Sequence, residues 1–512
     1  MSISGLAERK AAEARAGAHR WLVLVVVSIA QLMVVLDATV VNIALPSAQH
    51  DLGFGNSERQ WIVTAYALAF GSLLLLGGRV GDLIGRKRIF LIALVAFALA
   101  SALGGAAPSF GVLVAARAIQ GVAGAMLAPA ALSTLVTTFT DPGERGKAFG
   151  VFGTVAVGGG AVGLILGGVL TEYLSWRWCM YVNVVFAAAA FLGALIYMSE
   201  AKPPVRPRID IVGTALAAIG LFGLVFGFSQ AELDGWASPV TIVSLVVGAA
   251  LLVAFVLVER NVSHPLLPLR VVADRSRGMA FAAVGIAGLA MFGLFLFLTY
   301  YLQVVKGMSP VLSGLAFLPM IACVMISSNT SNIVTLPRFG PRIVITIGMV
   351  LGFLGLSYLS RLNVHSSYAG GVLPALILMG LAMGMVMAPS MNTATAGVQP
   401  QDSGVAAALV STMQQVGGSI GTAVLSTIAA SVTVSYAASH AGTSAFASAT
   451  HGYTVVFMTS ALIFAVGGVL AAVFFPSKAR LAQMRESAAA GAPSVQVARA
   501  DTELLDEVGA IG

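Results

Sequence analysis

Residues 21–46 read WLVLVVVSIAQLMVVLDATVVNIALP, and this stretch decides the kind of fold that the chain can adopt. Asp37 is its one charged residue. About 20 apolar residues, at about 1.5 Å of rise each, cross the roughly 30 Å of hydrocarbon in a bilayer. A charged tail precedes the stretch, but no small-residue cleavage site followed by a soluble domain comes after it. We therefore interpret it as a retained spanning helix and not as a signal peptide.

The composition of the whole chain agrees with this reading. Of its 512 residues, 58% are hydrophobic and 10% are charged, and the mean hydropathy is +0.93, whereas a soluble domain carries roughly 25% charged residues. This excludes a cytoplasmic enzyme, a disordered chain and a disulfide-stabilised secreted domain. The apolar residues come in long runs, which favours spanning helices over an outer-membrane barrel. Cys179 and Cys323 lie within such runs and are interpreted as packing residues.

The apolar runs predict an all-α polytopic membrane protein with about fourteen transmembrane helices. We expect them near residues 21–46, 59–79, 88–107, 111–137, 147–171, 178–199, 210–229, 238–258, 278–303, 311–335, 342–360, 370–391, 404–431 and 452–475.

Basic residues predict the orientation, because Lys and Arg are enriched in cytoplasmic loops. With the N-terminus inside, the outer segments hold only Arg59, Arg177, Lys306 and Arg361 of the 28 Lys and Arg. We therefore expect a multi-pass protein of the cell membrane with both termini in the cytoplasm. The net charge of +7 is assigned to topology and not to binding of nucleic acid.

Two weak internal repeats indicate how the helices are grouped. The loop at 81–88, GDLIGRKR, has an echo in PRFGPR at 337–342, and DPGERGKA at 141–148 has one in QPQDSGVA at 399–406. Both pairs fall at equivalent places if the seventh and eighth helices are an insertion between two six-helix halves. Parallel halves of this kind are a transporter architecture, with the substrate site at their interface near the midplane.

This organisation predicts five segments. They are a cytoplasmic N-terminal tail at 1–20, an N-terminal six-helix half at 21–199, linkers and the inserted helix pair at 200–277, a C-terminal six-helix half at 278–476, and a cytoplasmic tail at 477–512 whose polar composition is typical of disorder.

Several short motifs follow one another along the chain. LDATVVNIALP at 36–46, the loop at 78–88, RAIQG at 117–121 and SWRW at 175–178 with Asn183 resemble motifs of the fourteen-span drug:proton antiporters of the major facilitator superfamily. GLILGG at 163–168 resembles the antiporter motif of the fifth helix, with Leu164 in place of its proline; Leu83 and Gln414 stand where Arg is common. The resemblance implies the superfamily fold of two six-helix halves plus two extra helices. It also implies export of hydrophobic small molecules driven by the proton gradient.

Asp37 and Arg117 are the candidate proton-coupling residues. Asp37 alone among the 21 acids lies within a predicted span, and a charge in the membrane marks function by default. Rise along the two helices places Asp37 and Arg117 at comparable depths, so we hypothesise that they face each other directly, or through water or Gln120. Burial disfavours a charged carboxyl and a guanidinium favours it, which suits proton coupling. The alternative is a permanent structural ion pair.

The loop between the second and third helices is a candidate conformational latch. The resemblance implies that Asp82 and Arg86 link helix ends across the halves in one access state, and Gly81 and Gly85 allow the tight backbone that such a loop needs. Alternatively, its basic residues only set topology.

Methionines and amides are candidates for the substrate cavity. Met379, Met383, Met387 and Met391 recur every four residues on the predicted twelfth helix, and methionine suits a promiscuous apolar surface. Gln31, Asn42 and Gln120 are amides at membrane depth that could orient a ligand. A methionine-rich packing face and amide bonds between helices are the alternatives. Gly163, Gly167 and Gly168 allow close approach to the fifth helix, for sliding or for static packing.

The leading function is proton-coupled export of neutral or singly charged apolar compounds such as drugs, antibiotics or dyes. The alternatives are a dedicated metabolite exporter and a proton symporter of the same fold. No HExxH or GxxxxGK[ST] motif occurs, so neither a zinc protease nor an ATP-driven pump is expected. We expect no enzymatic activity, no cofactor, no metal and no nucleic-acid partner, and a monomer in the bilayer.

Overall fold

The computed structural model describes residues 3–55, 58–139, 141–200, 210–262, 265, 267–396, 398, 403–440 and 442–476. These residues form helices and connecting turns, and none of them lies in a strand. The predicted linker at 201–209 and the tail at 477–512 lie outside the described residues. The all-α fold that the sequence predicted is confirmed.

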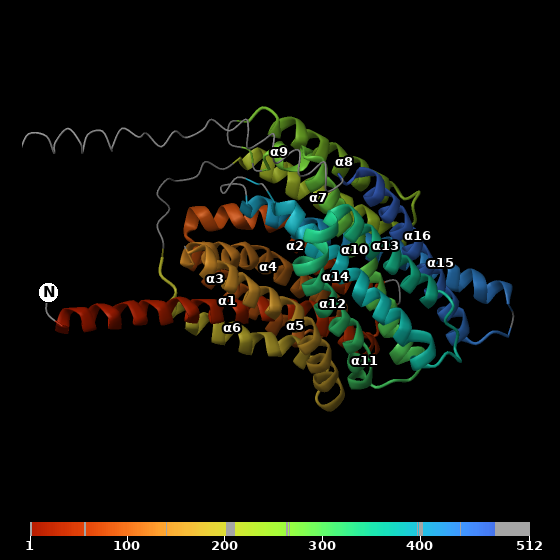
Figure 1. Ribbon diagram of the computed structural model, residues 1–512. Coiled ribbons are helices and arrows are strands. Elements are labelled where there is room, and N and C mark those ends of the chain that lie inside the picture. The colour runs from red at the N-terminus through yellow and green to blue at the C-terminus, as the bar shows by residue number, and fades with distance from the viewer. Residues whose placement is uncertain are drawn as a thin grey trace, which may run out of the picture.

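The first six helices form the N-terminal half (Figure 1). They are α1 (Ile3–Leu52), α2 (Gln60–Ile84), α3 (Arg86–Gly105), α4 (Phe110–Thr138), α5 (Pro142–Tyr173) and α6 (Trp178–Tyr197). Helix α1 begins well before the predicted start at residue 21 and extends beyond its neighbours in Figure 1. The sequence AERKAAEARA at 7–16 explains this, because Ala, Glu, Lys and Arg are strong helix formers.

The inserted pair comes next, followed by the C-terminal half. The pair is α7 (Ile211–Asp234) and α8 (Pro239–Glu259). The short helix α9 (Leu269–Ala273) lies within the predicted linker segment. The C-terminal half consists of α10 (Arg275–Tyr300), α11 (Pro310–Ala316), α12 (Leu318–Thr330), α13 (Leu336–Leu359), α14 (Leu373–Thr395), α15 (Ser403–Ser439) and α16 (Ala445–Phe474), with wide helical turns η1 (Tyr301–Val305), η2 (Ser331–Thr335) and η3 (Tyr368–Val372).

Eleven helical stretches among the described residues are long and apolar enough to cross a membrane. Shorter apolar helices lie at Gln60–Leu74 and Val212–Phe228. The stretch Pro310–Leu359 has 50 residues, or about 75 Å of helix, more than twice the bilayer core. Gly340 interrupts it with φ 79°. The total of fourteen crossings and the boundaries of the five segments stay predictions.

The two halves repeat one packing pattern. Helix α1 packs on α5 and α6 while α3 packs on α4 and α6; in the same way α10 packs on α15 and α16 while α13 packs on α14 and α16. The halves meet through α2 against α15 and through α5 against α11 and α12. The inserted α7 packs on α8 and on both α2 and α15, so it covers one seam between the halves.

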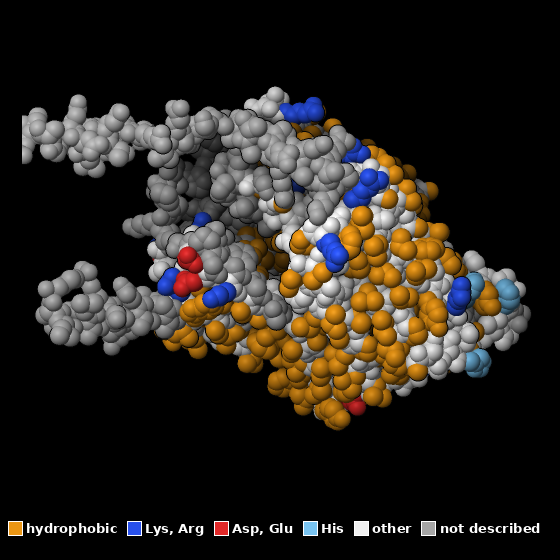
Figure 2. Space-filling model, in the orientation of Figure 1, with side chains coloured by type: hydrophobic (Ala, Val, Ile, Leu, Met, Phe, Trp, Pro, Cys, Tyr) orange, Lys and Arg blue, Asp and Glu red, His pale blue; other side chains and the backbone are white. Residues whose placement is uncertain are grey.

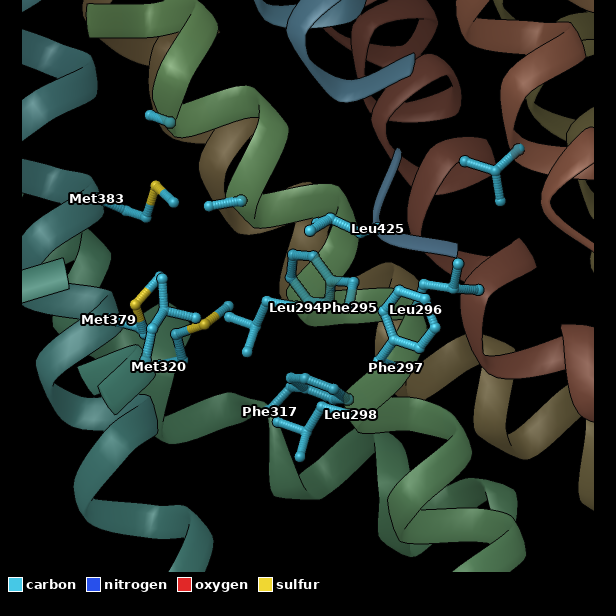
Figure 3. Packing of buried hydrophobic residues seen from close by; sticks show 14 of the residues in the cluster. Leu294, Phe295, Leu296, Phe297, Leu298, Phe317, Met320, Met379, Met383 and Leu425 are labelled. Atoms are coloured by element: carbon cyan, nitrogen blue, oxygen red, sulfur yellow. The ribbon is translucent and has the colours of Figure 1, made fainter. Parts of the chain in front are cut away.

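The distribution of apolar side chains is that of a protein in a bilayer and not of a protein in water. Figure 2 shows hydrophobic side chains over most of the described surface in view, and Val246, Leu99 and Leu462 are each more than half exposed. Inside, leucine, phenylalanine and methionine side chains from α10, α11–α12, α14 and α15 pack together in the C-terminal half (Figure 3). A mostly apolar exterior around an apolar interior is stable in lipid and not in water, because too little polar surface is present to face a solvent.

Candidate functional site

Asp37 lies at the centre of a buried polar cluster in the N-terminal half. Its side chain is 0% exposed and that of Arg117 is 2% exposed. Arg117 Nη1 on α4 donates to Asp37 Oδ2 at 2.5 Å, so the contact hypothesised from their depths is present. Gln120 Nε2 at 3.0 Å and Asn183 Nδ2 at 2.8 Å both donate to Asp37 Oδ1. Three donors thus converge on this one buried carboxylate.

Ser101 on α3 completes the cluster. Its hydroxyl oxygen accepts from Gln120 Nε2 at 3.0 Å and from Asn183 Nδ2 at 3.1 Å, and it donates to the Met180 carbonyl at 2.7 Å. The network therefore joins four helices, α1, α3, α4 and α6. Ser101 was not predicted from the sequence, since a lone serine in an apolar helix carries no pattern. Asn183 entered only through the family resemblance.

Helix α2 also contacts Arg117. Arg117 Nε donates to the Ile62 carbonyl at 3.1 Å, and the guanidinium lies over the Tyr66 ring, 4.5 Å from its centroid. The Tyr66 hydroxyl and Asn183 Oδ1 are buried and have no hydrogen-bond partner among the described residues. The cluster thus contains a donor and an acceptor that no described residue pairs, and an unpaired buried polar group costs about 1–3 kcal/mol.

The predicted cavity residues are not gathered in one place. Gln120 belongs to the cluster around Asp37, whereas Gln31 and Asn42 are half-buried on α1, and Asn42 Nδ2 donates to the Ala38 carbonyl of its own helix. Their role toward a ligand stays a prediction.

The four methionines of α14 do not share one face of the helix. Met379 and Met383 are buried beside Met320 (Figure 3), Met387 is half-buried, and Met391 is 37% exposed. A step of four residues advances a helix by about 400°, so the face drifts about 40° at each step. The inner pair therefore packs in the core while the last methionine faces outward.

Gly85 makes the sharp turn between α2 and α3. It has φ 107°, which L side chains rarely adopt, and a Cβ there would lie 1.9 Å from Glu200 Oε1. Gly81 carbonyl accepts from the Gly85 amide at 3.1 Å, and Arg86 Nη1 donates to the Ser133 carbonyl of α4 at 3.4 Å. The side chain of Asp82 lies outside the described part of the structure. The latch role of this loop stays a prediction.

The glycines of α5 permit two different close contacts. A Cβ at Gly163 would lie 2.0 Å from Thr39 Oγ1, and one at Gly167 would lie 3.1 Å from Val40 Cα, so both face α1. A Cβ at Gly168 would lie 2.7 Å from Val311 Cα on α11, across the boundary between the halves. Only glycine fits at Gly168 without a shift of the neighbouring helix, whereas a Cβ at Gly163 would displace the Thr39 side chain.

The halves also touch at the end of the bundle opposite the N-terminal tail. The Arg59 guanidinium is buried over the Tyr300 ring, and the Tyr300 hydroxyl donates to Gln49 Oε1 at 2.5 Å. Gln303 Nε2 donates to the Ile43 carbonyl at 3.0 Å. In the sequence Arg59 was assigned only a place in an outer loop, so its burial is a finding of the structure.

Two six-helix halves, with a buried charge pair inside the N-terminal half, are an architecture of secondary transporters. The family model of the Major Facilitator Superfamily matches residues 27–422, and the chain belongs to this superfamily. It is a multi-pass membrane transporter and not an enzyme. The resemblance seen in the sequence is thereby confirmed.

Individual relatives and one solved structure are similar to this chain in sequence and in fold, respectively. The chain is 49% identical over 475 residues to the puromycin resistance protein of Streptomyces alboniger, covering 92% of this chain and 94% of that protein. It is 40% identical over 412 residues to the cephamycin export protein of Amycolatopsis lactamdurans, covering 80% and 85%. The POT family transporter PepTSo shares the fold with a TM-score of 0.66 at 14% identity, covering 91% of this chain and 98% of that one.

Proposed function

We propose that the chain exports hydrophobic small molecules across the cytoplasmic membrane in exchange for protons, with both termini in the cytoplasm. The observation that carries this proposal is the fully buried Asp37 carboxylate with its three donors on α4 and α6. A charged side chain at this depth is energetically costly and marks function by default, and a proton carrier needs a titratable group of this kind.

Protonation of Asp37 would change how α1 is held. A neutral carboxyl loses the charge attraction to Arg117, whose remaining acceptors are Gln120 Oε1 and the Ile62 carbonyl. Because Asp37 is shielded from water here, proton entry requires α1 to move relative to α4 and α6. One proton entering down about 100 mV releases about 2.3 kcal/mol, enough to bias two packed arrangements about 50-fold.

The contacts between the halves fit one state of an alternating cycle. Arg59 with Tyr300, and Gln303 with the Ile43 carbonyl, join the halves at the end that we assign to the outside. We infer that this arrangement is closed to the outside and that substrate enters from the cytoplasm. Arg20, Arg86 and Lys87 lie at the opposite end, as the enrichment of basic residues in cytoplasmic loops requires.

The substrate class rests on charge and on relatives. Among the described side chains of the two six-helix halves, Asp37 carries the only buried carboxylate, and Arg117 neutralises it, which favours neutral or singly charged apolar compounds over dications. The two relatives described above are each named for one antibiotic, which also supports the alternative of an exporter dedicated to one compound.

Efflux from proteoliposomes across a panel of compounds tests the proposal. With an imposed proton gradient, wild-type protein should move substrate uphill and a protonophore should abolish this movement. Asp37→Asn should lose uphill movement while substrate exchange continues, and Asp234→Asn, an exposed acid at the end of α7, is the matched control. Unchanged uphill efflux in Asp37→Asn would overturn the proposal. Accumulation together with protons would identify a symporter, and a single transported compound a dedicated exporter.

A further inference from the structure

A basic pocket of about 250 Å³ opens at the end of the bundle that holds the N-terminal tail. Four helices line it: α1, α3, α4 and α6. Its lining contains three cationic side chains, three threonines and a tyrosine, and no carboxylate; these are Arg20, Arg86, Lys87, Thr134, Thr137, Thr138 and Tyr197. Neither the Asp37 cluster nor the seam between the halves contributes to it.

The charges of Lys87 and Arg20 in this pocket are only weakly compensated. Lys87 Nζ donates to the Leu195 carbonyl at 3.0 Å and to the Met198 carbonyl at 2.6 Å, which are neutral acceptors at the end of α6. Arg20 pairs with Glu144 at 2.8 Å, but both side chains are more than a third exposed, where an ion pair is weak. Glu200 lies beside Gly85 and does not line the pocket. The pocket therefore presents hydroxyl donors and the weakly compensated charges of Lys87 and Arg20, the chemistry that recognises a phosphate group.

Exposed apolar side chains next to the pocket indicate that the phosphate belongs to a lipid. Leu195 and Ile196 on α6 and Ile92 on α3 are exposed within two turns of the lining residues. Trp21 is half-exposed next to Arg20 and packs edge-on against Phe139 at 5.3 Å. Tryptophan is enriched where headgroups meet hydrocarbon, and basic pockets between helices at that level bind anionic headgroups.

We propose that this pocket binds the phosphate of an anionic phospholipid in the cytoplasmic leaflet, with the acyl chains along the apolar flank of α3 and α6. The proposal rests on the proposed function only for the assignment of this end to the cytoplasm. A headgroup here bridges α1, α3, α4 and α6 beside the Gly85 turn. It therefore stabilises the N-terminal half.

Binding of defined lipids to the purified full chain tests this without any transport measurement. Native mass spectrometry and thermal unfolding in detergent should both show saturable binding of phosphatidylglycerol and little effect of phosphatidylcholine. Each lysine or arginine near an anionic headgroup contributes about fivefold in affinity. Lys87→Gln and Arg20→Gln should thus each weaken phosphatidylglycerol binding by about fivefold. Arg88→Gln is the matched control, because Arg88 is exposed, follows Lys87 directly and does not line the pocket.

Three results would overturn the proposal. One is equal binding of phosphatidylcholine. Another is a loss in Arg88→Gln as large as in Lys87→Gln, which would indicate surface charge alone. The third is stabilisation by inorganic phosphate or glycerol 3-phosphate as strong as by the lipid, which would indicate a soluble ligand. If Lys87→Gln does not fold, Arg20→Gln decides the matter. Selective lipid binding by a chain without proton-driven efflux would contradict the proposed function and leave this inference standing.

Discussion

The Arg59 guanidinium at the start of α2 lies 4.0 Å from the centroid of the Tyr300 ring at the end of α10. The Phe297 ring is 5.5 Å away on the same helix, so one buried cation from the N-terminal half faces two aromatic rings of the C-terminal half. This contact bridges the halves where they close.

Replacing Arg59 by Gln should open this end of the molecule. A desolvated cation–π contact contributes about 2 kcal/mol, so the closed arrangement should lose up to about 30-fold in population. Double electron–electron resonance between spin labels at Ser109 and His365, exposed positions on the two halves, should report longer distances in Arg59→Gln. Labelling requires Cys179→Ala and Cys323→Ala. The exposed Arg361→Gln is the control and should leave the distances unchanged; identical distances in both variants would contradict the prediction.

Asn183 should affect transport by way of its hydrogen bond to Asp37 and not through a separate role. Asn183→Leu removes one donor from the carboxylate and one from Ser101, so uphill efflux should fall by about tenfold, the effect of one lost buried hydrogen bond. Combined with Asp37→Asn, it should lower the thermal midpoint by less than the sum of the two single losses, since contacting residues are not additive. Asn392→Leu, whose side chain bonds Asn332 on the exposed surface, is the control. Additive losses in the double variant would argue against the network.

Gly168→Ala should separate the halves along α5. The new Cβ would lie 2.7 Å from Val311 Cα and 2.8 Å from the Pro310 oxygen, both backbone atoms that cannot rotate away. Overpacking of this kind typically costs about 1–3 kcal/mol, so the thermal midpoint and the efflux rate should both fall. Gly158→Ala on the same helix has open space within 4 Å and should behave as wild type. Equal behaviour of the two variants would show that the contact is not constraining.

The methionines of α14 should separate into two kinds. Met383→Ala leaves a cavity in the core and should lower stability by about 2–5 kcal/mol, measured by thermal unfolding. Met391→Ala, on the exposed face, should leave stability unchanged. If Met391 contributes to a substrate surface, its replacement changes the relative efflux of compounds in a panel; an unaltered panel would limit these residues to packing.

Part of the buried site could be predicted from the sequence. Asp37 could be found from the sequence because it is the one acid in a long apolar run, and Arg117 because its depth matches. Ser101 could not be found, since the face that α3 turns toward α4 and α6 is decided by packing. Arg59 was misleading in a different way: a basic residue beside a predicted span looks like a topology determinant, and only the approach of α10 buries it.

Sequence alone determined the membrane class, the helical fold and the expected orientation. In a bilayer every backbone group bonds within its own helix, so spans depend on local length and hydropathy. Tertiary structure decided which side chains meet, because contacts between helices depend on close packing of their faces and not on spacing along the chain. The stretch at 21–46 thus predicts a membrane helix by itself, but the packing of α3, α4 and α6 determines which side chains contact Asp37.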